Sequence, residues 1–240
     1  MTSAAERIRT AIENGGEKVW TMHDFPGLPS LAVAQTLSRL AKTGSLTRVG
    51  KGTYYRVRET TFGLSQPNPK LLRERVAKVA PVFPSGLTAA HLLGFSTQVP
   101  AREELATTSG SLPRSLVGSN VLITTRRPTA WRTLSNKDAA LLDFIRNRGE
   151  GSELSPVETL KKVLEYLAEG RTFENLLRVA TSEPPRVRAL LGSLGQELGK
   201  SDRKLKSIRR TLNPLSRFDF GVLSAMKSAP LWQAKESAIS

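Results

Sequence analysis

The sequence contains no cysteine among its 240 residues. Disulfides, thiolate nucleophiles and zinc sites with cysteine ligands are therefore excluded. Only two histidines, His23 and His91, are present, and they lie far apart along the chain. Because metal sites built from imidazoles need several such ligands, we expect no metal site of this kind.

Long hydrophobic runs are also lacking, although apolar residues make up 39% of the chain. No stretch approaches the roughly 20 consecutive apolar residues that a membrane-spanning helix requires. The first residues, MTSAAERIRTAIENGG, lack the apolar centre of a secretory signal. We therefore expect a cytoplasmic protein that has no membrane partner.

Acidic residues are few relative to basic ones, since 21 Asp and Glu stand against 36 Lys and Arg and leave a formal net charge of +15. A field of this sign attracts polyanions and speeds their encounter with the protein, which favours a nucleic-acid partner. The segment from Pro184 to Arg217 is especially basic, with nine Lys or Arg and two acids. It predicts a second basic surface, for which a solvated helix face is the equally weighted alternative. The candidates are Arg186, Arg203, Lys204, Lys206, Arg209 and Arg210.

The segment from Val19 to Val57 predicts a short helix, a tight turn, a second helix and a hairpin. Gly27 and Pro29 supply the turn, because glycine accepts unusual φ angles and proline fixes φ. From Ser30 to Thr43 the apolar residues recur at spacings of three and four, which places them on one side of a helix. Gly44 ends this helix. The apolar positions are Val33, Leu37, Leu40 and Ala41.

Two β-branched and aromatic runs follow, Leu46–Val49 and Thr53–Val57, and a Gly-Lys-Gly turn with Lys51 at its tip joins them into a predicted hairpin. With a first helix over Ser3–Asn14, this order of elements predicts a winged helix-turn-helix domain over residues 1–64. In such a domain the second helix enters the major groove of double-stranded DNA and the hairpin lies along the backbone. Winged helices that bind only protein are the alternative. The predicted contacts are Gln35, Ser38 and Arg39 to base edges, and Ser30, Lys42, Arg48, Lys51 and Arg56 to phosphates.

A second domain is predicted over residues 70–240, after a proline-restricted linker at 65–69. It begins with a helix over Lys70–Val79 and a short helix over Ser85–Phe95, in which His91 is expected to be a structural residue. Strands are predicted over 105–108 and 121–125. Helices with apolar spacings of three and four follow over 136–147, 156–168, 173–181, 184–198 and 201–212. The fold class is therefore α+β, mostly helical, with a small sheet followed by several helices.

The sequence contains only partial matches to known catalytic motifs. Asp219-Phe220-Gly221 matches the metal-binding tripeptide of protein kinases, but no glycine-rich loop or His-Arg-Asp loop precedes it. The Gly-Ser pairs at 118–119 and 192–193 lack the nearby acidic pair of a two-metal site, and no phosphate-binding loop of the Walker type is present. We expect no catalytic residue, no metal and no cofactor, and therefore a binding protein rather than an enzyme.

Three segments together resemble a known family. They are the Arg48–Tyr55 hairpin, RVGKGTYY, the segment Ser85–Pro100, SGLTAAHLLGFSTQVP, and the stretch Asn213–Asp219, NPLSRFD. The chain resembles the AbiEi-type antitoxins of bacterial abortive-infection (type IV) toxin-antitoxin systems over most of its length. The hairpin motif is shared by many winged helices, and the segment after it is the more specific.

The resemblance implies an N-terminal domain that binds inverted repeats upstream of its own operon and represses transcription. It also implies a C-terminal antitoxin domain that supports neutralisation of a cognate nucleotidyltransferase toxin, with or without direct contact. Two other functions remain open from the residues themselves. They are a ligand-responsive winged-helix transcription factor unrelated to a toxin, and a nucleic-acid-processing enzyme that uses the winged helix for targeting.

Overall fold

The computed structural model describes residues 3–56, 59–61, 63–64, 81–110, 112 and 120–235. The chain divides into two compact units. Unit 1 comprises residues 1–80 with 111–119, and unit 2 comprises residues 81–110 with 120–240. Helices and small sheets occur in an α+β arrangement. The predicted linker at 65–69 and the predicted helix at 70–79 lie outside the described residues.

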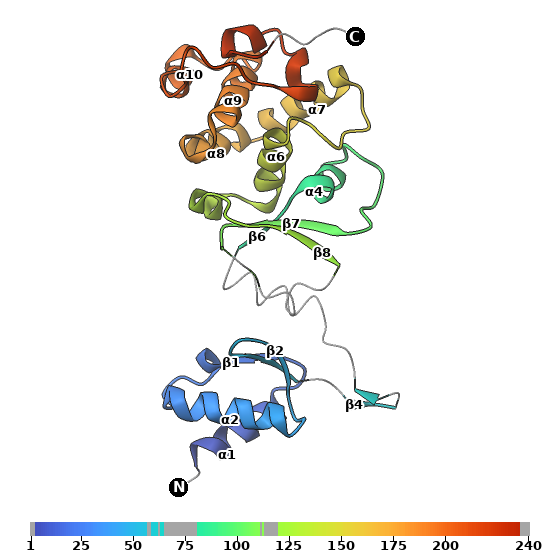
Figure 1. Ribbon diagram of the computed structural model, residues 1–240, viewed down its shortest axis with the longest axis vertical. Coiled ribbons are helices and arrows are strands. Elements are labelled where there is room, and N and C mark those ends of the chain that lie inside the picture. Colours follow the sequence, from blue (N-terminus) through green and yellow to red (C-terminus); the bar gives the residue numbers. More distant parts are fainter. Residues whose placement is uncertain are drawn as a thin grey trace. The chain divides into compact units, whose positions relative to one another are not determined.

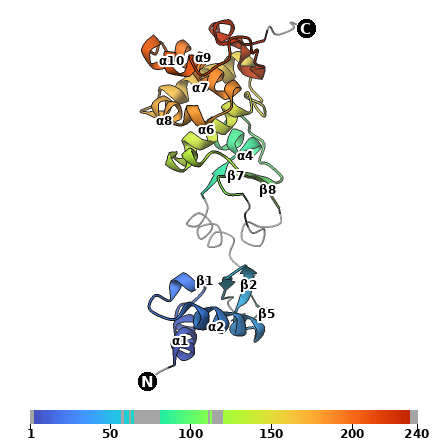
Figure 2. The same ribbon diagram turned by 60° about the vertical axis from the view of Figure 1, so that its left-hand side comes forward.

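The described residues of unit 1 form two helices and a three-stranded antiparallel sheet in the order β1-β3-β2 (Figures 1 and 2). A separate two-stranded pair, β4 with β5, follows the sheet along the chain. The elements in chain order are α1 (Ala4–Asn14), β1 (Val19–Thr21), the 3₁₀ turn η1 (Met22–Asp24), α2 (Ser30–Lys42), β2 (Thr47–Gly50), β3 (Thr53–Tyr55), β4 (Glu59–Thr60) and β5 (Gly63–Leu64).

The helices predicted over Ser3–Asn14 and Ser30–Thr43 are confirmed as α1 and α2. The hydroxyl of Ser3 accepts a hydrogen bond from the Glu6 amide at 3.2 Å and caps the start of α1. After the C-terminal end of α2 the chain passes through Gly44. Its φ of +80° is a left-handed conformation that glycine adopts without strain. Both helix ends therefore carry the residue types that their backbone geometry requires.

The prediction of a short helix directly after Val19 is wrong for its first three residues. Val19, Trp20 and Thr21 form a buried strand that pairs with Tyr55, Tyr54 and Thr53 of β3. This run is β-branched and aromatic, and such residues pack well on a pleated surface when a partner strand is available. The partner lies more than thirty residues away along the chain, so local pattern alone does not reveal it. Only the three-residue turn η1 remains of the predicted helix.

An apolar cluster of described residues holds the helices and the sheet of unit 1 together. Residues of α1, α2 and the sheet contribute to it, and the rings of Trp20 and Phe25 stack with centroids 5.5 Å apart. Tyr55 is fully buried, and its hydroxyl donates a hydrogen bond to the Glu17 carboxylate. Besides Trp20 and Phe25, the buried members of the cluster are Ile8, Ile12, Val33, Leu37, Leu40, Leu46 and Tyr54.

Unit 2 begins with a three-stranded sheet of β6 (Val82–Pro84), β7 (Glu103–Thr107) and β8 (Val121–Thr124). Strand β7 lies in the centre, antiparallel to β6 and parallel to β8. The predicted strands at 105–108 and 121–125 are confirmed as β7 and β8. Strand β6 was not predicted, because the prolines at its ends would interrupt a central strand, whereas an edge strand such as this one tolerates them.

The helices of unit 2 lie on one side of this sheet in both views, with α4 and α6 next to the strands (Figures 1 and 2). The predicted helices are confirmed with shifts of a few residues at their ends. The helices are α4 (Gly86–Leu92), α6 (Asn136–Arg146), α7 (Pro156–Ala168), α8 (Thr172–Val179), α9 (Pro185–Glu197) and α10 (Asp202–Arg209), with 3₁₀ turns η2 (Thr129–Thr133), η3 (Ala180–Ser182), η4 (Gly221–Ala225) and η5 (Ala229–Trp232).

The C-terminal segment packs back onto the helices of unit 2. The Phe218 amide donates to the Gln233 carbonyl at 2.7 Å, and the Lys235 amide donates to the Phe218 carbonyl at 2.8 Å. Trp232 is fully buried beside Gly192 of α9, where a Cβ atom would lie 2.1 Å from the indole ring. A side chain at position 192 would therefore displace the tryptophan, so glycine is required at this crossing.

The segment after α4 is held by one carboxylate. Glu153 accepts hydrogen bonds from the Ser96 hydroxyl at 2.8 Å and from the amide and hydroxyl of Thr97 at 2.9 Å each. These bonds, led by the one from the Thr97 amide, lower the pKa of Glu153 below its ordinary value.

His91 of α4 is exposed, contrary to the expectation that its ring is structural. Its apolar sequence neighbours do not enclose it, because the buried face of α4 is narrow and consists of Ala89 and Ala90.

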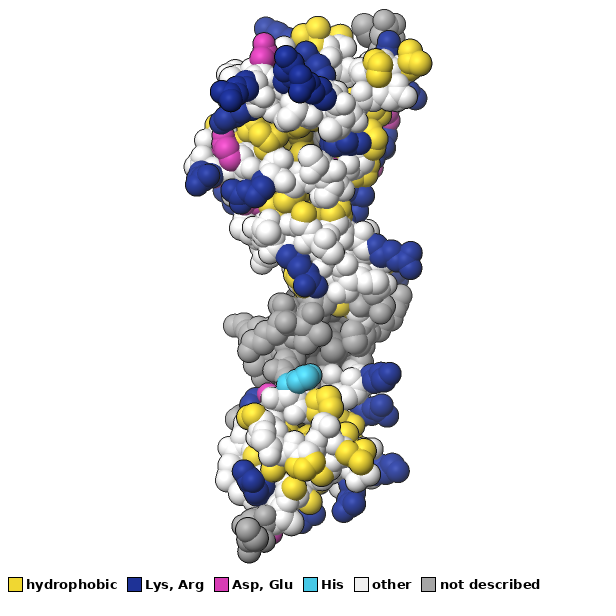
Figure 3. All heavy atoms as spheres, turned by 90° about the vertical axis from the view of Figure 1, so that its left-hand side faces the viewer, with side chains coloured by type: hydrophobic (Ala, Val, Ile, Leu, Met, Phe, Trp, Pro, Cys, Tyr) yellow, Lys and Arg dark blue, Asp and Glu magenta, His cyan; other side chains and the backbone are white. Residues whose placement is uncertain are grey.

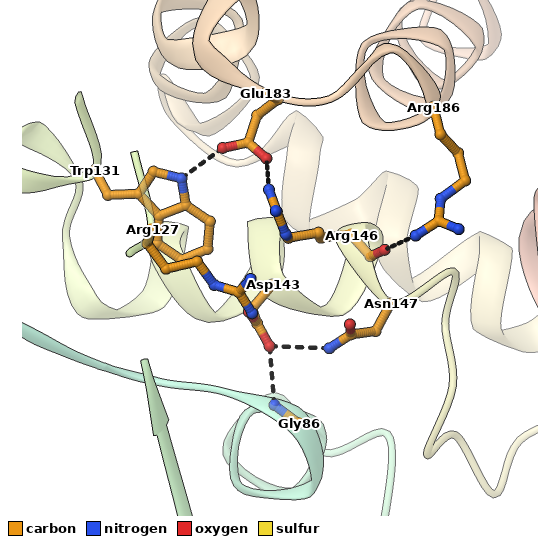
Figure 4. A network of polar contacts seen from close by, with 8 residues as sticks. All are labelled: Gly86, Arg127, Trp131, Asp143, Arg146, Asn147, Glu183 and Arg186. Atoms are coloured by element: carbon orange, nitrogen blue, oxygen red, sulfur yellow. Dashed lines mark hydrogen bonds and ion pairs between the residues drawn. The ribbon is translucent and has the colours of Figure 1, made fainter. Parts of the chain in front are cut away.

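Two of the three buried carboxylates in the described part of unit 2 organise the network of polar contacts that Figure 4 draws. The first, Asp143 of α6, has no exposed side-chain surface. It accepts from Arg127 Nη2 at 2.5 Å, from the Gly86 amide at 2.9 Å and from Asn147 Nδ2 at 3.0 Å. The same carboxylate therefore joins the start of α4, the segment after β8 and the end of α6.

The second carboxylate is Glu183, which follows η3 and is also buried. It accepts from the indole Nε1 of Trp131 at 2.6 Å and forms an ion pair with Arg146 (Figure 4). The carbonyl of Arg146 in turn accepts from Arg186 Nη2 at 3.3 Å. Each buried charge thus has an opposite charge or a dipole next to it, as burial requires.

We expect that Asp143→Ala destabilises the protein by about 3–5 kcal/mol, because it leaves the guanidinium of Arg127 without its carboxylate in a nearly buried position. Urea denaturation measures this change. The matched control is Glu169→Ala, which breaks the exposed Lys137–Glu169 pair and should change stability by less than about 1 kcal/mol. Equal effects of the two variants would show that the Asp143 contacts do not hold unit 2 together.

Candidate nucleic-acid interface

One open depression lies on the outward face of α2. It has a volume of about 580 Å³ and is lined by Ala34, Gln35, Ser38, Arg39 and Lys42. Four of these are predicted contact residues, and the structure brings them together because they recur at spacings of three and four on one helix face. Ser30, the remaining predicted contact on this helix, is exposed at its first position and does not line the depression.

The orientation of this face follows from the burial of the opposite one. Val33, Leu37 and Leu40 are 0%, 1% and 7% exposed and pack in the core that α1 shares. A helix that buries these positions must direct the polar side chains between them toward solvent. The donors of Gln35, Arg39 and Lys42 are therefore presented outward by a rigid element.

The hairpin of β2 and β3 carries two further predicted cations, Arg48 and Lys51, and both are exposed. The register shifts between Arg48 and Gly50, so that Val49 is the extra residue of a bulge, and its side chain is 5% exposed. Gly52 has a φ of +68°, which the tight turn requires. Lys51 consequently projects from the hairpin tip.

Arg56 lies in a different environment from the other predicted contacts. It is half-buried, and its Nη1 donates to the carbonyls of Ile12, at 2.6 Å, and Glu13. These carbonyls belong to the last turn of α1, which contains no basic residue of its own. A cation there satisfies unpaired acceptors and stabilises the negative end of the helix dipole. This role of Arg56 was not predicted, because the contact joins residues more than forty positions apart.

The second basic set is divided between two helices. Arg186 is half-buried in the first turn of α9, where it donates to the Arg146 carbonyl. The other predicted members are exposed on α10 or at its end. Figure 3 shows Lys and Arg side chains gathered on the face of unit 2 that it displays. The exposed members are Arg203, Lys204, Lys206, Arg209 and Arg210.

The Asp219-Phe220-Gly221 tripeptide has a structural role. The Asp219 carboxylate accepts from the Gly221 amide at 2.8 Å and pairs with Arg148. The Gly221 amide, followed by the Arg148 guanidinium, lowers the pKa of Asp219. Among the described residues, no group of three or more His, Asp or Glu side chains is arranged to hold a metal ion.

None of the helices in the described part of the chain is both long and apolar enough to reach across a bilayer.

We expect that Arg56→Ala lowers the stability of the protein by about 1–2 kcal/mol, because it removes charge-assisted hydrogen bonds to the end of α1. Thermal unfolding measures the change. The control is Lys51→Ala, whose side chain at the hairpin tip is exposed, so its stability should stay within about 0.5 kcal/mol of the wild type. If Arg56→Ala unfolds like the control, its contacts with α1 are energetically negligible.

Solved structures similar to this chain include the "Crystal structure of RV2827C protein from Mycobacterium tuberculosis". It shares 18% sequence identity with a TM-score of 0.43, over 91% of this chain and 85% of that chain. No curated protein matches the chain. A family model described as "Family of unknown function (DUF6088)" matches residues 13–141. This match covers more than half of the sequence, and the chain therefore belongs to the family of unknown function DUF6088.

Proposed function

We propose that this protein binds operator DNA through unit 1, represses its own operon and acts as the antitoxin of a type IV toxin-antitoxin system. The observation that carries the DNA-binding part is the depression on α2, where Gln35, Ser38, Arg39 and Lys42 converge on one exposed face. The proposed activity is binding, and no residue is assigned a catalytic role.

The order of elements in unit 1 supports a winged helix-turn-helix domain. In this proposal α2 is the recognition helix and the β2–β3 hairpin is the wing. A helix with side chains is about 10–12 Å wide, and the major groove of B-DNA is about 12 Å wide, so an exposed helix face such as that of α2 fits the groove.

The side chains of α2 have the chemistry for reading base edges. An arginine donates two parallel hydrogen bonds to the O6 and N7 atoms of guanine, and a glutamine pairs in the same way with adenine. Arg39 and Gln35 are the residues assigned to this role. Ser38 lies between them on the same face and donates or accepts as its hydroxyl rotates.

The remaining cations are assigned to phosphates. Lys42 at the end of α2, and Arg48 and Lys51 on the hairpin, carry charges that position a duplex without reading its sequence. Ser30 offers a hydroxyl and an amide at the start of α2. Arg56 is assigned mainly to the end of α1, because its Nη1 donates to two carbonyls there.

The antitoxin part of the proposal rests on the resemblance of three segments to AbiEi-type antitoxins. These segments are RVGKGTYY at 48–55, SGLTAAHLLGFSTQVP at 85–100 and NPLSRFD at 213–219. One winged helix covers only a few base pairs, so an inverted repeat would be occupied by two protomers. The proposed partner besides DNA is a nucleotidyltransferase toxin.

Co-expression tests the antitoxin part. The gene adjacent to this one in its operon, if it encodes a nucleotidyltransferase, is expressed alone and together with this protein. Restored growth on co-expression supports the proposal. Continued growth arrest, with both proteins present in the cell, contradicts it and leaves the DNA-binding part untouched.

We expect Arg39→Ala and Lys51→Ala to weaken DNA binding in different ways. Loss of a base contact should cost about 1–3 kcal/mol on operator DNA and little on random DNA. Loss of a phosphate contact should weaken both duplexes alike and lower the slope of log K against log salt by about 0.9. Fluorescence anisotropy measures both quantities, with the region upstream of the protein's own gene as the operator and a shuffled duplex as the random DNA.

The control is Lys161→Ala, an exposed lysine on α7 in unit 2, which should bind both duplexes as the wild type does. If Arg39→Ala and Lys51→Ala lose affinity equally on operator and random DNA, the assignment of Arg39 to base edges is incorrect. If neither variant loses affinity, α2 and the hairpin are not the DNA-binding surface.

A further inference from the structure

Helix α10 presents a row of three exposed cations. Leu205 and Ile208 are both 3% exposed and fix the buried side of the helix. Arg203, Lys206 and Arg210 follow one another at spacings of three and four, which places them within a sector of about 60° at 100° per residue. Arg210 keeps a helical backbone conformation at the C-cap, so the row is continuous. We call these three residues the α10 ridge.

Two other cations of α10 are engaged inside the protein. Lys204 lies 3.6 Å from the Glu174 carboxylate, whose pKa is lowered, first of all by its hydrogen bond from Lys200. The guanidinium of Arg209 lies over the ring of Trp232 at 4.6 Å. The described residues supply no hydrogen bond or ion pair to the side chains of the α10 ridge. The ridge therefore holds the cations of this helix that remain available to a partner.

Helix stability explains only part of the ridge. Lys206 lies in the last turn and Arg210 at the C-cap, where cations interact favourably with the helix dipole. Arg203 lies in the first turn, where the dipole disfavours a positive charge. A solvated helix has no need of a cation in line with the other two at that position.

The composition of the ridge favours a nucleic-acid duplex over other partners. Protein interfaces centre on apolar or aromatic anchors and are depleted of lysine, and the ridge has no such anchor. Single strands are bound by stacking of bases on exposed aromatic rings. Trp232, the ring beneath Arg209, is fully buried. What the ridge offers is a line of charges.

The length of the ridge matches a phosphate backbone. From Arg203 to Arg210 the helix rises by about 10 Å at 1.5 Å per residue. Each strand of duplex DNA carries a charge about every 3.4 Å along the axis. Three cations on a line of this length can therefore each meet a phosphate on one stretch of duplex.

We propose that the α10 ridge, Arg203, Lys206 and Arg210, is a second DNA-binding surface that contacts the phosphate backbone of duplex DNA. The identity of the nucleic acid as DNA rests on the proposed function, whereas the ridge itself is defined by unit 2 alone. It adds affinity that is independent of base sequence. The ridge thus retains the protein on DNA next to the sequence that α2 reads.

The test uses the full chain with Arg203→Gln, Lys206→Gln and Arg210→Gln combined. The control combines Lys161→Gln, Arg171→Gln and Arg178→Gln, which remove the same charge from exposed positions elsewhere in unit 2. Binding to a 40-base-pair random DNA duplex is measured over a series of salt concentrations. The ridge variant should lower the salt slope by about 2–3, since each phosphate contact contributes about 0.9, and the control should leave it unchanged.

A slope for the ridge variant equal to that of the control overturns the proposal. So does a loss confined to an RNA duplex of the same sequence, measured in parallel. Lysine acetylation of the wild-type protein gives a readout that needs no variant. Lys206 should be protected by the DNA duplex while Lys161 reacts as before, and reaction of Lys206 at its free rate contradicts the proposal.

The same acetylation experiment separates this inference from the proposed function. Protection of Lys51 without protection of Lys206 supports the hairpin as a DNA contact and overturns the ridge. Protection of Lys206 without protection of Lys51 supports the ridge and contradicts the role of the hairpin. Protection of both supports two DNA-binding surfaces on one chain.

Discussion

The burial of three aliphatic side chains on α2 is the constraint on which the organisation of unit 1 depends. Val33, Leu37 and Leu40 fill the core that α1 and the sheet also line. Because a helix has fixed angular spacing, burying these positions determines the direction of every other side chain on it. The exposed donors of α2 therefore require no contacts of their own to hold their direction. The proposed reading of DNA relies on the same hydrophobic packing that stabilises the unit.

Unit 2 uses charge differently, because carboxylates are buried within it, and two of them pair with arginines. Asp143 and Glu183 each sit beside an arginine, and each also accepts from a group on another element. A buried ion pair is weak evidence for stability, but removal of one partner is costly. Arg127 and Arg146 are thus committed to the interior, and the cations left to meet a partner are those on the surface, such as the exposed ones of α10.

The sequence predicted most of the helices, because their apolar residues recur at helical spacing over ten or more positions. Helix α7, with its proline start and apolar row, matches its predicted bounds of Pro156 to Ala168. The elements that were missed depend on distant partners. Val19–Thr21 becomes a strand because β3 lies beside it, and Val82–Pro84 becomes one because β7 does. Of the predicted contact surface, the exposed face of α2 can be predicted from the spacing of its residues alone. The environment of Arg56 cannot, because it depends on where the end of α1 lies in the folded unit.

Arginine shows most clearly why residue type does not determine function in this chain. Arg39 is exposed on a helix face, Arg56 donates to the carbonyls that end α1, and Arg127 faces a buried carboxylate. The three side chains are chemically identical, and their surroundings decide which donors remain for a ligand. A guanidinium that already faces a fixed acceptor would have to break that contact to reach a phosphate, and this lowers the gain in binding free energy. Net charge alone therefore overstates the number of cations available to a polyanionic partner, and the cations available are those whose neighbours in the fold leave them exposed.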